Sequence, residues 1–360
     1  MSKPDLNAGF TDVDRTDQPG SELGAGSPPP HVQVIQMALG YWVSRAVAAA
    51  ADLGIADHLT DGPQSAEHLA AVTGTHPEAL RRLLRTLASV GLFRTDAHGH
   101  IALTPLGATL RSDAPGAARS TVIALAGGWM WSAWGELPHA LRTGETGMER
   151  AHGMGEYQYL MRHPEQATHF NAAMIGYHGD EPGAIAERYD FSGVGTLVDV
   201  GGGSGNLLAT ILRANPQLRG ILLERPQVVP DAERTMAAAG VADRCTVVAG
   251  DFLQAVPAGG DLYIVSHCIH NWDEASCVRI LENCRRAMGP GGRLLIIEAI
   301  VRPGDEPDPA KLLDLQMLVV PGGQERSRDE YGRLLELAGL RLTRVVPTRT
   351  SASLIEAVAS

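Results

Sequence analysis

The 360-residue sequence has few cysteines, a deficit of positive charge and no long hydrophobic run. Its 4 cysteines include no C-x-x-C spacing, which argues against a zinc site. The 30 Lys and Arg residues against 41 Asp and Glu give a net charge of −11, which disfavours non-specific binding to nucleic acid or an anionic membrane. No run reaches the length of a membrane span, and no signal-peptide core is present. We therefore expect a cytoplasmic protein with free thiols and with no membrane or nucleic-acid partner.

The N-terminal part of the chain is a polar tail followed by helical patterns. Residues 1–28 are rich in Gly, Ser, Asp and Pro, which predicts a disordered tail. From His31 to Val47 the apolar residues form one broad helical face, which predicts burial either at a subunit interface or within one chain. Helices over 66–72 and 77–90 and a hairpin over 93–103 follow in a winged-helix order. Arginines on the second of these helices leave DNA binding as an alternative, which the acidic balance disfavours.

The chain is organised around the segment from Val198 to Asn206, which reads V-D-V-G-G-G-S-G-N. An apolar run enters this segment and a helical pattern leaves it, so a strand, a glycine turn and a helix are predicted. Glycines permit positive φ values and a close approach of the backbone to a ligand. Glu224 follows a second apolar run, where an acid can accept two hydrogen bonds from a ribose diol. These features predict a nucleoside-binding βαβ unit.

The predicted ligand of this unit is S-adenosylmethionine. The dinucleotide motif G-x-G-x-x-G is incomplete, because Asn206 holds the third glycine position. Asp199 ends the strand, where its charge would repel a pyrophosphate but attract a cationic ligand. S-adenosylmethionine carries an adenosine, a sulfonium and an ammonium group, and no phosphate. The alternative is a glycine-rich turn that binds no ligand.

Strands and helical patterns alternate through the C-terminal half. The expected strands cover residues 196–200, 220–223, 246–249, 262–265, 293–298, 340–345 and 353–357. This order predicts an α/β fold with a doubly wound, mostly parallel, seven-stranded sheet. The last two strands are joined by a short link, so we expect them to pair antiparallel. We expect the ligand site along the carboxyl ends of the parallel strands.

Longer matches extend these patterns. The segments 197–203, 223–226, 250–252, 270–273 and 322–327, together with Glu298, come in the order of a known family. On them the sequence resembles the S-adenosylmethionine-dependent small-molecule O-methyltransferases of the caffeic acid and hydroxyindole type, including bacterial members of antibiotic pathways. The resemblance covers about residues 30–358. It implies a winged-helix-like dimerisation domain over 29–113 and a Rossmann-like catalytic domain over 114–360, in which 114–185 form a helical acceptor-pocket region. Because members are typically intertwined homodimers, a homodimer is expected.

The resemblance also implies the site residues. His270 matches the general base, and Glu298 and Glu325 match the two glutamates that flank it, although Glu325 could instead pair with Arg326 at the surface. The implied cofactor-binding residues are Asp199, Gly201, Gly203, Glu224, Asp251, Phe252 and Ser266. Ser266 stands where the family often has Lys or Arg, and a helix N-cap is the alternative role for Asp251.

The acceptor-binding residues are expected in the helical region and beside the base. They are Phe170, Met174, Asn271 and Met317, with Trp129 from a cluster of tryptophans. Core filling is the alternative role for Phe170, Met174 and Trp129. His267 and His270 are three residues apart, but no third ligand motif lies near them in the sequence, so no metal is expected.

The predicted function is O-methylation of a hydroxyl group on an aromatic or polyketide-type secondary metabolite. His270 would take the hydroxyl proton, and S-adenosylhomocysteine would be the second product. One alternative keeps the fold but changes the reaction to N-methylation, decarboxylation, hydroxylation or a pericyclic step. Another is a cofactor-sensing DNA-binding regulator. The acceptor itself cannot be read from the sequence.

Overall fold

A computed structural model describes residues 28–360, so the predicted tail over 1–28 lies outside the described residues except for its last position. The described residues divide into two compact units, 28–42 and 43–360. The apolar segment predicted as one helix forms two, α1 (Pro30–Leu39) and α2 (Tyr41–Asp52), which are separated by Gly40. Gly40 itself keeps a helical backbone conformation, with φ −53° and ψ −27°, so the interruption is confined to this weak helix former. No residue of α1 is buried, and Val34, Ile35 and Met37 are exposed.

The segment Pro30–Asp52 spans 23 residues with a mean hydropathy of 1.2. By length and composition alone it could cross a membrane, so the expectation that no run reaches that length is wrong. This is weak evidence for a membrane span, because a signal sequence and a core helix can have the same length and composition.

The next helical part of the chain has the predicted winged-helix order. Helix α3 (Ala66–Thr73) begins at Ser65, whose Oγ accepts a hydrogen bond from the His68 amide, and ends at Gly74. Helix α4 (Pro77–Ser89) starts with its proline in the first turn, as predicted. Strands β1 (Phe93–Thr95) and β2 (Ile101–Leu103) form the antiparallel hairpin. The short elements η1 (Asp57–Leu59) and α5 (Pro105–Ala108) complete this part.

Seven helices cover residues 118–188, and the sequence predicts a helical region over 114–185. They are α6 (Ala118–Ala126), α7 (Gly128–Gly135), α8 (Leu137–Thr143), α9 (Gly147–His152), α10 (Glu156–Arg162), α11 (Pro164–His178) and α12 (Glu181–Arg188). Trp129, Met130 and Met148 form a buried cluster among them with Val319 of α16 (Pro309–Val319). The rings of Trp129 and Tyr159 stack at 5.3 Å.

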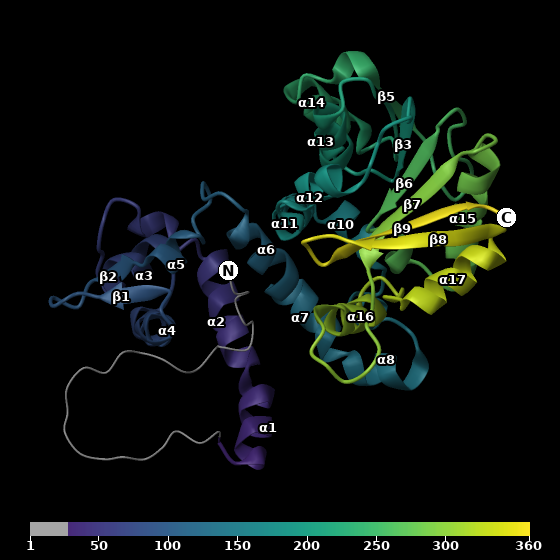
Figure 1. Ribbon diagram of the computed structural model, residues 1–360. Helices are drawn as coiled ribbons and strands as arrows, with labels where there is room; N and C mark the ends of the chain where they lie inside the picture. Colours follow the sequence, from purple (N-terminus) through teal and green to yellow (C-terminus); the bar gives the residue numbers. More distant parts are fainter. Residues whose placement is uncertain (1–27) are drawn as a thin grey trace, which may run out of the picture. The chain divides into compact units, whose positions relative to one another are not determined.

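The sheet has seven strands in the order β5-β4-β3-β6-β7-β9-β8 (Figure 1). They are β3 (Thr196–Val200), β4 (Arg219–Glu224), β5 (Cys245–Ala249), β6 (Leu262–Ser266), β7 (Arg293–Ala299), β8 (Leu340–Pro347) and β9 (Ala352–Ala359). Strands β3 to β7 pair parallel, whereas β9 pairs antiparallel with both β7 and β8. The predicted strands and the antiparallel last pair are confirmed. The strand order reverses between β3 and β6, which places a ligand crevice at their carboxyl ends.

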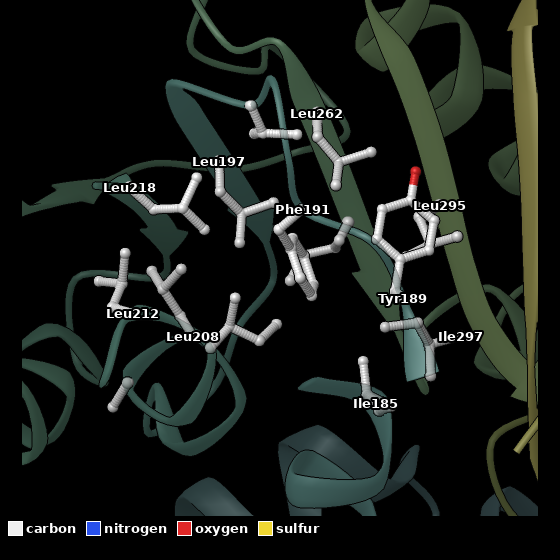
Figure 2. Packing of buried hydrophobic residues seen from close by; sticks show 14 of the residues in the cluster. Ile185, Tyr189, Phe191, Leu197, Leu208, Leu212, Leu218, Leu262, Leu295 and Ile297 are labelled. Carbon is white, nitrogen blue, oxygen red and sulfur yellow. The ribbon is translucent and has the colours of Figure 1, made fainter. Parts of the chain in front are cut away.

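Helices cover both faces of this sheet. Leu197 packs on one face with α12, α13 (Asn206–Ala214) and α14 (Val229–Ala238); Figure 2 shows it close to Leu208 and Phe191. Its neighbour Val198 faces the opposite layer, formed by α15 (Glu274–Ala287) and α17 (Arg328–Leu337). This alternation follows from the two-residue period of a strand. Helix α15 buries Cys277 and Cys284 as free thiols, as predicted.

Candidate active site

His270 lies on the short helix η3 (Ile269–Asn271), which directly follows β6. Its Nδ1 lies 2.6 Å from Oε1 of Glu325 and 3.0 Å from Oε2 of Glu298. Glu298 is the last but one residue of the neighbouring strand β7, and its Oε1 accepts hydrogen bonds from the backbone amides of Cys268 and His270. The structure therefore brings together the three residues expected to form the base and its two acids. Nδ1 is held by the glutamates, so Nε2 is the ring nitrogen left for a ligand.

The loop that carries Glu325 is fitted against the backbone of His270. The Gln324 amide donates a hydrogen bond of 2.9 Å to the His270 carbonyl oxygen. A Cβ atom at Gly323 would lie only 1.9 Å from that oxygen, so a side chain there requires the backbone to move. Glu325 is 4% exposed, and its amide donates to Oδ1 of Asp314. The alternative of a surface pair with Arg326 is not what the structure shows, since both residues are buried.

The two glutamates change the protonation of the histidine. Burial on its own would lower the pKa of His270, but the charge of Glu298 and the hydrogen bond to Glu325 outweigh it and raise the pKa to about 9. Burial raises the pKa of Glu298, and the positive charge of His270 opposes that rise. With this pKa the free imidazole is protonated at neutral pH, so His270 accepts a proton from a ligand hydroxyl only in its neutral form, which becomes more populated as the pH rises.

The glycine turn after β3 has the predicted left-handed conformations, with φ values of 73° at Gly201 and 57° at Gly203. Asp199 is 1% exposed, and within residues 28–360 neither of its carboxylate oxygens has a hydrogen-bond partner. Burial, followed by the charge of Glu224, raises the pKa of Asp199 to about 7. A Cβ at Gly202 would lie 2.4 Å from Oδ2 of Asp199, so only glycine permits this close approach. A cationic ligand such as S-adenosylmethionine would compensate this buried carboxylate.

The other predicted cofactor residues line the same cavity. Oε2 of Glu224 accepts from the Gly203 amide at 3.0 Å, which links the ends of β3 and β4. Asp251 accepts from the Leu253 amide, so it does cap a local turn while it faces the cavity. Phe252 lies against Gly201, and its ring meets the Trp272 ring edge-to-face at 5.8 Å. Ser266 also lines the cavity.

The cavity has a volume of about 1310 Å³ and includes His270 in its wall. Pockets for one drug-sized ligand have roughly 300–1,000 Å³, so this one has room for a cofactor and an acceptor together. The predicted acceptor residues Phe170, Met174, Asn271 and Met317 line it. Trp129 does not: it is buried behind Phe170, with the two rings 6.4 Å apart edge-to-face, so core packing accounts for it.

The cavity wall also holds ionisable side chains that no sequence motif indicates, among them Glu156, His178 and Glu181. His178 ends α11 and Glu181 begins α12, and Nε2 of His267 lies 2.6 Å from Oε1 of Glu181. His267 has a φ of 45°, a left-handed conformation that is uncommon outside glycine. Glu156 and Glu181 come from helices without a motif, and His178 lies beyond the Phe170 and Met174 positions of its helix, so only the tertiary structure reveals them.

The structure corrects the expectation that no third metal-ligating group lies near His267 and His270. Potential ligand atoms of His178, Glu181 and His267 all lie within 4.8 Å of one another, and so do those of His267, His270 and Glu298. A third metal-ligating group does therefore lie near His267 and His270, although 86 positions separate Glu181 from His267. Burial and the neighbouring His267 lower the pKa of His178 to about 4, so its ring is neutral at pH 7.

The fold and the site define a Rossmann-like methyltransferase that uses S-adenosylmethionine. The cavity lies where the strand order reverses, the Asp199 carboxylate has no partner among the described residues, and a buried histidine lies beside two glutamates. More particularly, the chain belongs to the O-methyltransferase family with a dimerisation domain: residues 134–341 match the O-methyltransferase domain and residues 35–113 match the O-methyltransferase dimerisation domain. The resemblance inferred from the motifs is confirmed.

Relatives of the chain act on natural products. It is 44% identical to the phenazine O-methyltransferase PhzM of Lysobacter antibioticus, over 92% of this chain and 97% of that protein. It is 42% identical to the mitomycin biosynthesis 6-O-methyltransferase of Streptomyces lavendulae, over 86% of this chain and 88% of that protein. Another relative, 36% identical over 87% of this chain and 92% of its own length, is the phenazine-1-carboxylate N-methyltransferase of Pseudomonas aeruginosa.

Solved structures agree with the fold and the cofactor. The crystal structure of LaPhzM superposes with a TM-score of 0.87 at 44% identity, over 92% of this chain and all of that one. NcsB1 from neocarzinostatin biosynthesis, in complex with S-adenosylmethionine and 2-hydroxy-5-methyl naphthoic acid, gives a TM-score of 0.80 at 36% identity, over 88% and 96% of the two chains. The chain is thus an S-adenosylmethionine-dependent methyltransferase of natural products, as predicted.

Proposed function

We propose that the protein transfers a methyl group from S-adenosylmethionine to a hydroxyl group of an aromatic or polyketide-type secondary metabolite. The observation that carries the proposal is the pairing of His270 with Glu298 and Glu325 inside the one cavity. The cofactor supplies an already activated methyl group, so the remaining tasks are alignment and removal of the hydroxyl proton. The O-methyltransferase relatives from phenazine and mitomycin biosynthesis support the same reaction.

The residues divide these tasks between them. Asp199 and Glu224 offer the carboxylates that a sulfonium, an ammonium and a ribose diol need. The apolar side chains of Phe170, Met174 and Met317 offer a surface for an aromatic ring. Nε2 of His270 accepts the hydroxyl proton, and Glu325 fixes the ring tautomer through Nδ1. This reaction needs no metal, and we propose none.

The second candidate is methylation of nitrogen. One specific comparison favours it: the Pseudomonas aeruginosa relative is a phenazine N-methyltransferase. A ring nitrogen or an amine that is already a free base does not require proton removal before attack. The strong pairing of His270 with two carboxylates, which serves to hold a transferred proton, therefore supports the hydroxyl acceptor.

Methyl transfer to matched acceptors tests the proposal. The protein is incubated with S-adenosylmethionine and one acceptor at a time. The hydroxyl acceptors are 2-naphthol and 1-hydroxyphenazine, the nitrogen acceptors are 2-naphthylamine and phenazine-1-carboxylate, and the product masses are measured by mass spectrometry. We expect each hydroxyl acceptor that reacts to gain one methylene unit on oxygen. Methylation of the nitrogen acceptors alone would replace the proposal with the N-methyltransferase. Consumption of the acceptors without methyl gain would contradict both.

We further propose that the protein is a cytoplasmic homodimer. The match to a dimerisation domain and the exposed apolar side chains of α1 support the dimer, since exposed apolar helices mark interaction surfaces. The free cysteines suit a reducing compartment. Sedimentation at micromolar concentration should give a dimer, and a monomer would contradict this proposal.

A further inference from the structure

Glu156 is a buried acid in the wall of the cavity. It is the first residue of α10 and only 8% exposed, yet it lines the same cavity as His270. The charges of Glu156 and His270 interact. Nothing in the proposed methyl transfer uses this carboxyl group.

The carboxyl group of Glu156 also has no partner of its own. Within residues 28–360 it makes no hydrogen bond and no ion pair. Other buried glutamates do: Glu181 pairs with His267, and Glu298 and Glu325 pair with His270. The Glu156 oxygens are not among the fully buried side-chain atoms that lack a partner, so they reach the cavity, where the hydroxyl or amino group of a ligand can donate to them.

The surroundings favour a hydrogen-bond donor as the missing partner. Burial raises the pKa of Glu156 to about 7, so the group is partly ionised at neutral pH. Both the ionised and the neutral carboxyl group can accept a hydrogen bond, whereas only the neutral one can donate. A ligand carboxylate would be repelled by the ionised form. The hydroxyl or amino group of a ligand fits both states.

The position of Glu156 points to the acceptor rather than the cofactor. The carboxylates proposed for the cofactor, Asp199 and Glu224, lie at the ends of β3 and β4. Glu156 comes from the helical region, from which Phe170 and Met174 also reach the cavity. It interacts with the proposed base, which must touch the acceptor hydroxyl.

We propose that Glu156 is a specificity-determining residue that selects acceptors with a second hydroxyl or amino group besides the hydroxyl that is methylated. The proposal rests on the proposed function and deepens it. A site that hydrogen-bonds a ligand OH or NH rejects an analogue without that group strongly, because its own buried polar group is then left unpaired.

Binding to the complex with S-adenosylhomocysteine tests this proposal without turnover. Calorimetry compares 2-naphthol with 2,3-, 2,6- and 2,7-dihydroxynaphthalene for the native protein, Glu156→Leu and Glu156→Gln. Glu149→Leu is the matched control, because Glu149 is an exposed acid of the preceding helix that does not line the cavity. We expect the native protein and the control to bind at least one diol tenfold or more tighter than 2-naphthol. Glu156→Leu should lose that preference, and Glu156→Gln should retain part of it through its carbonyl oxygen.

Three outcomes would overturn the proposal. They are a native protein without any diol preference, a preference that survives Glu156→Leu, and a loss of S-adenosylhomocysteine affinity in place of acceptor affinity. The proposed function fails separately, if the native protein transfers no methyl group to any hydroxyl acceptor while the diol preference in binding is intact.

Discussion

Nδ1 of His270 lies 2.6 Å from Oε1 of Glu325, although 55 positions separate the two residues in the chain. Strand β6 ends just before the histidine, and the loop after α16 brings the glutamate to it. Because both residues are buried, the pair controls the charge and the orientation of the imidazole ring. A change to either residue should therefore alter the protonation of the ring and the rate of methyl transfer.

The first prediction concerns the pKa of His270. Nuclear magnetic resonance of the histidine-labelled free protein should show one ring that titrates at about 9, which is absent in His270→Ala. Since the folded pKa lies above the ordinary value of about 6.5, the stability that the pairing contributes is fully present below pH 6.5 and is lost as the pH rises through 9. Glu325→Gln should lower the pKa, because it removes one negative charge. A native pKa at or below 6.5 would contradict the pairing.

The same titration distinguishes the two forms of the cofactor. A positive sulfonium in the cavity disfavours a second positive charge, so S-adenosylmethionine should lower the pKa of His270. S-adenosylhomocysteine carries a neutral thioether and should lower it less. Equal shifts with both molecules would show that the sulfonium does not lie near the base.

The second prediction concerns the cofactor. Glu224→Ala should weaken S-adenosylmethionine binding at least tenfold by calorimetry, because hydrogen bonds to a charged group contribute on the order of 1.5–3 kcal/mol. It also removes the acceptor for the Gly203 amide, which loosens the glycine turn. Glu233→Ala is the control, since Glu233 is exposed on α14 and does not line the cavity. An unchanged affinity in Glu224→Ala would remove this residue from the cofactor site.

The third prediction concerns the loop behind the base. Gly323→Ala would place a Cβ 1.9 Å from the carbonyl oxygen of His270, so the backbone must move. We expect a loss of roughly 1–3 kcal/mol in the free energy of unfolding, as overpacking usually causes, together with a fall in turnover. Gly289→Ala is the control, because no atom lies within 4 Å of a Cβ built there. If Gly323→Ala matched the native protein in both thermal unfolding and turnover, the close contact between Gly323 and the His270 carbonyl oxygen would be contradicted.

Local sequence patterns are enough to predict most of the fold, and the residues they indicate for the cofactor line one cavity. The strand alternation and the glycine turn are short-range signals, and they placed Asp199, Glu224 and the antiparallel last strands where the structure has them. The tryptophan cluster suggests an aromatic acceptor wall, but the sequence does not show which way each ring points. In the structure Trp129 packs against Phe170 and does not line the cavity. The break at Gly40 was missed, since the apolar pattern continues across it.

The parts of the site that long-range contacts create could not be predicted. Glu181 meets His267 only because α12 packs beside the end of β6, and neither residue belongs to a local motif. Glu156 is one acid among many in the sequence, and only its burial in the cavity wall distinguishes it. Acceptor recognition depends on such long-range contacts, so local sequence patterns do not identify the acceptor.

The most direct test of the proposed mechanism is the turnover of His270→Ala with hydroxyl acceptors of graded pKa. For weakly acidic acceptors at neutral pH, turnover should fall by about 10²–10⁴, the usual contribution of a positioned general base. The loss should shrink for acceptors that are already ionised, because they need no base, while cofactor affinity stays near that of the native protein. Equal rates and an equal dependence on acceptor pKa in the native protein and the variant would contradict the role of His270 as the base.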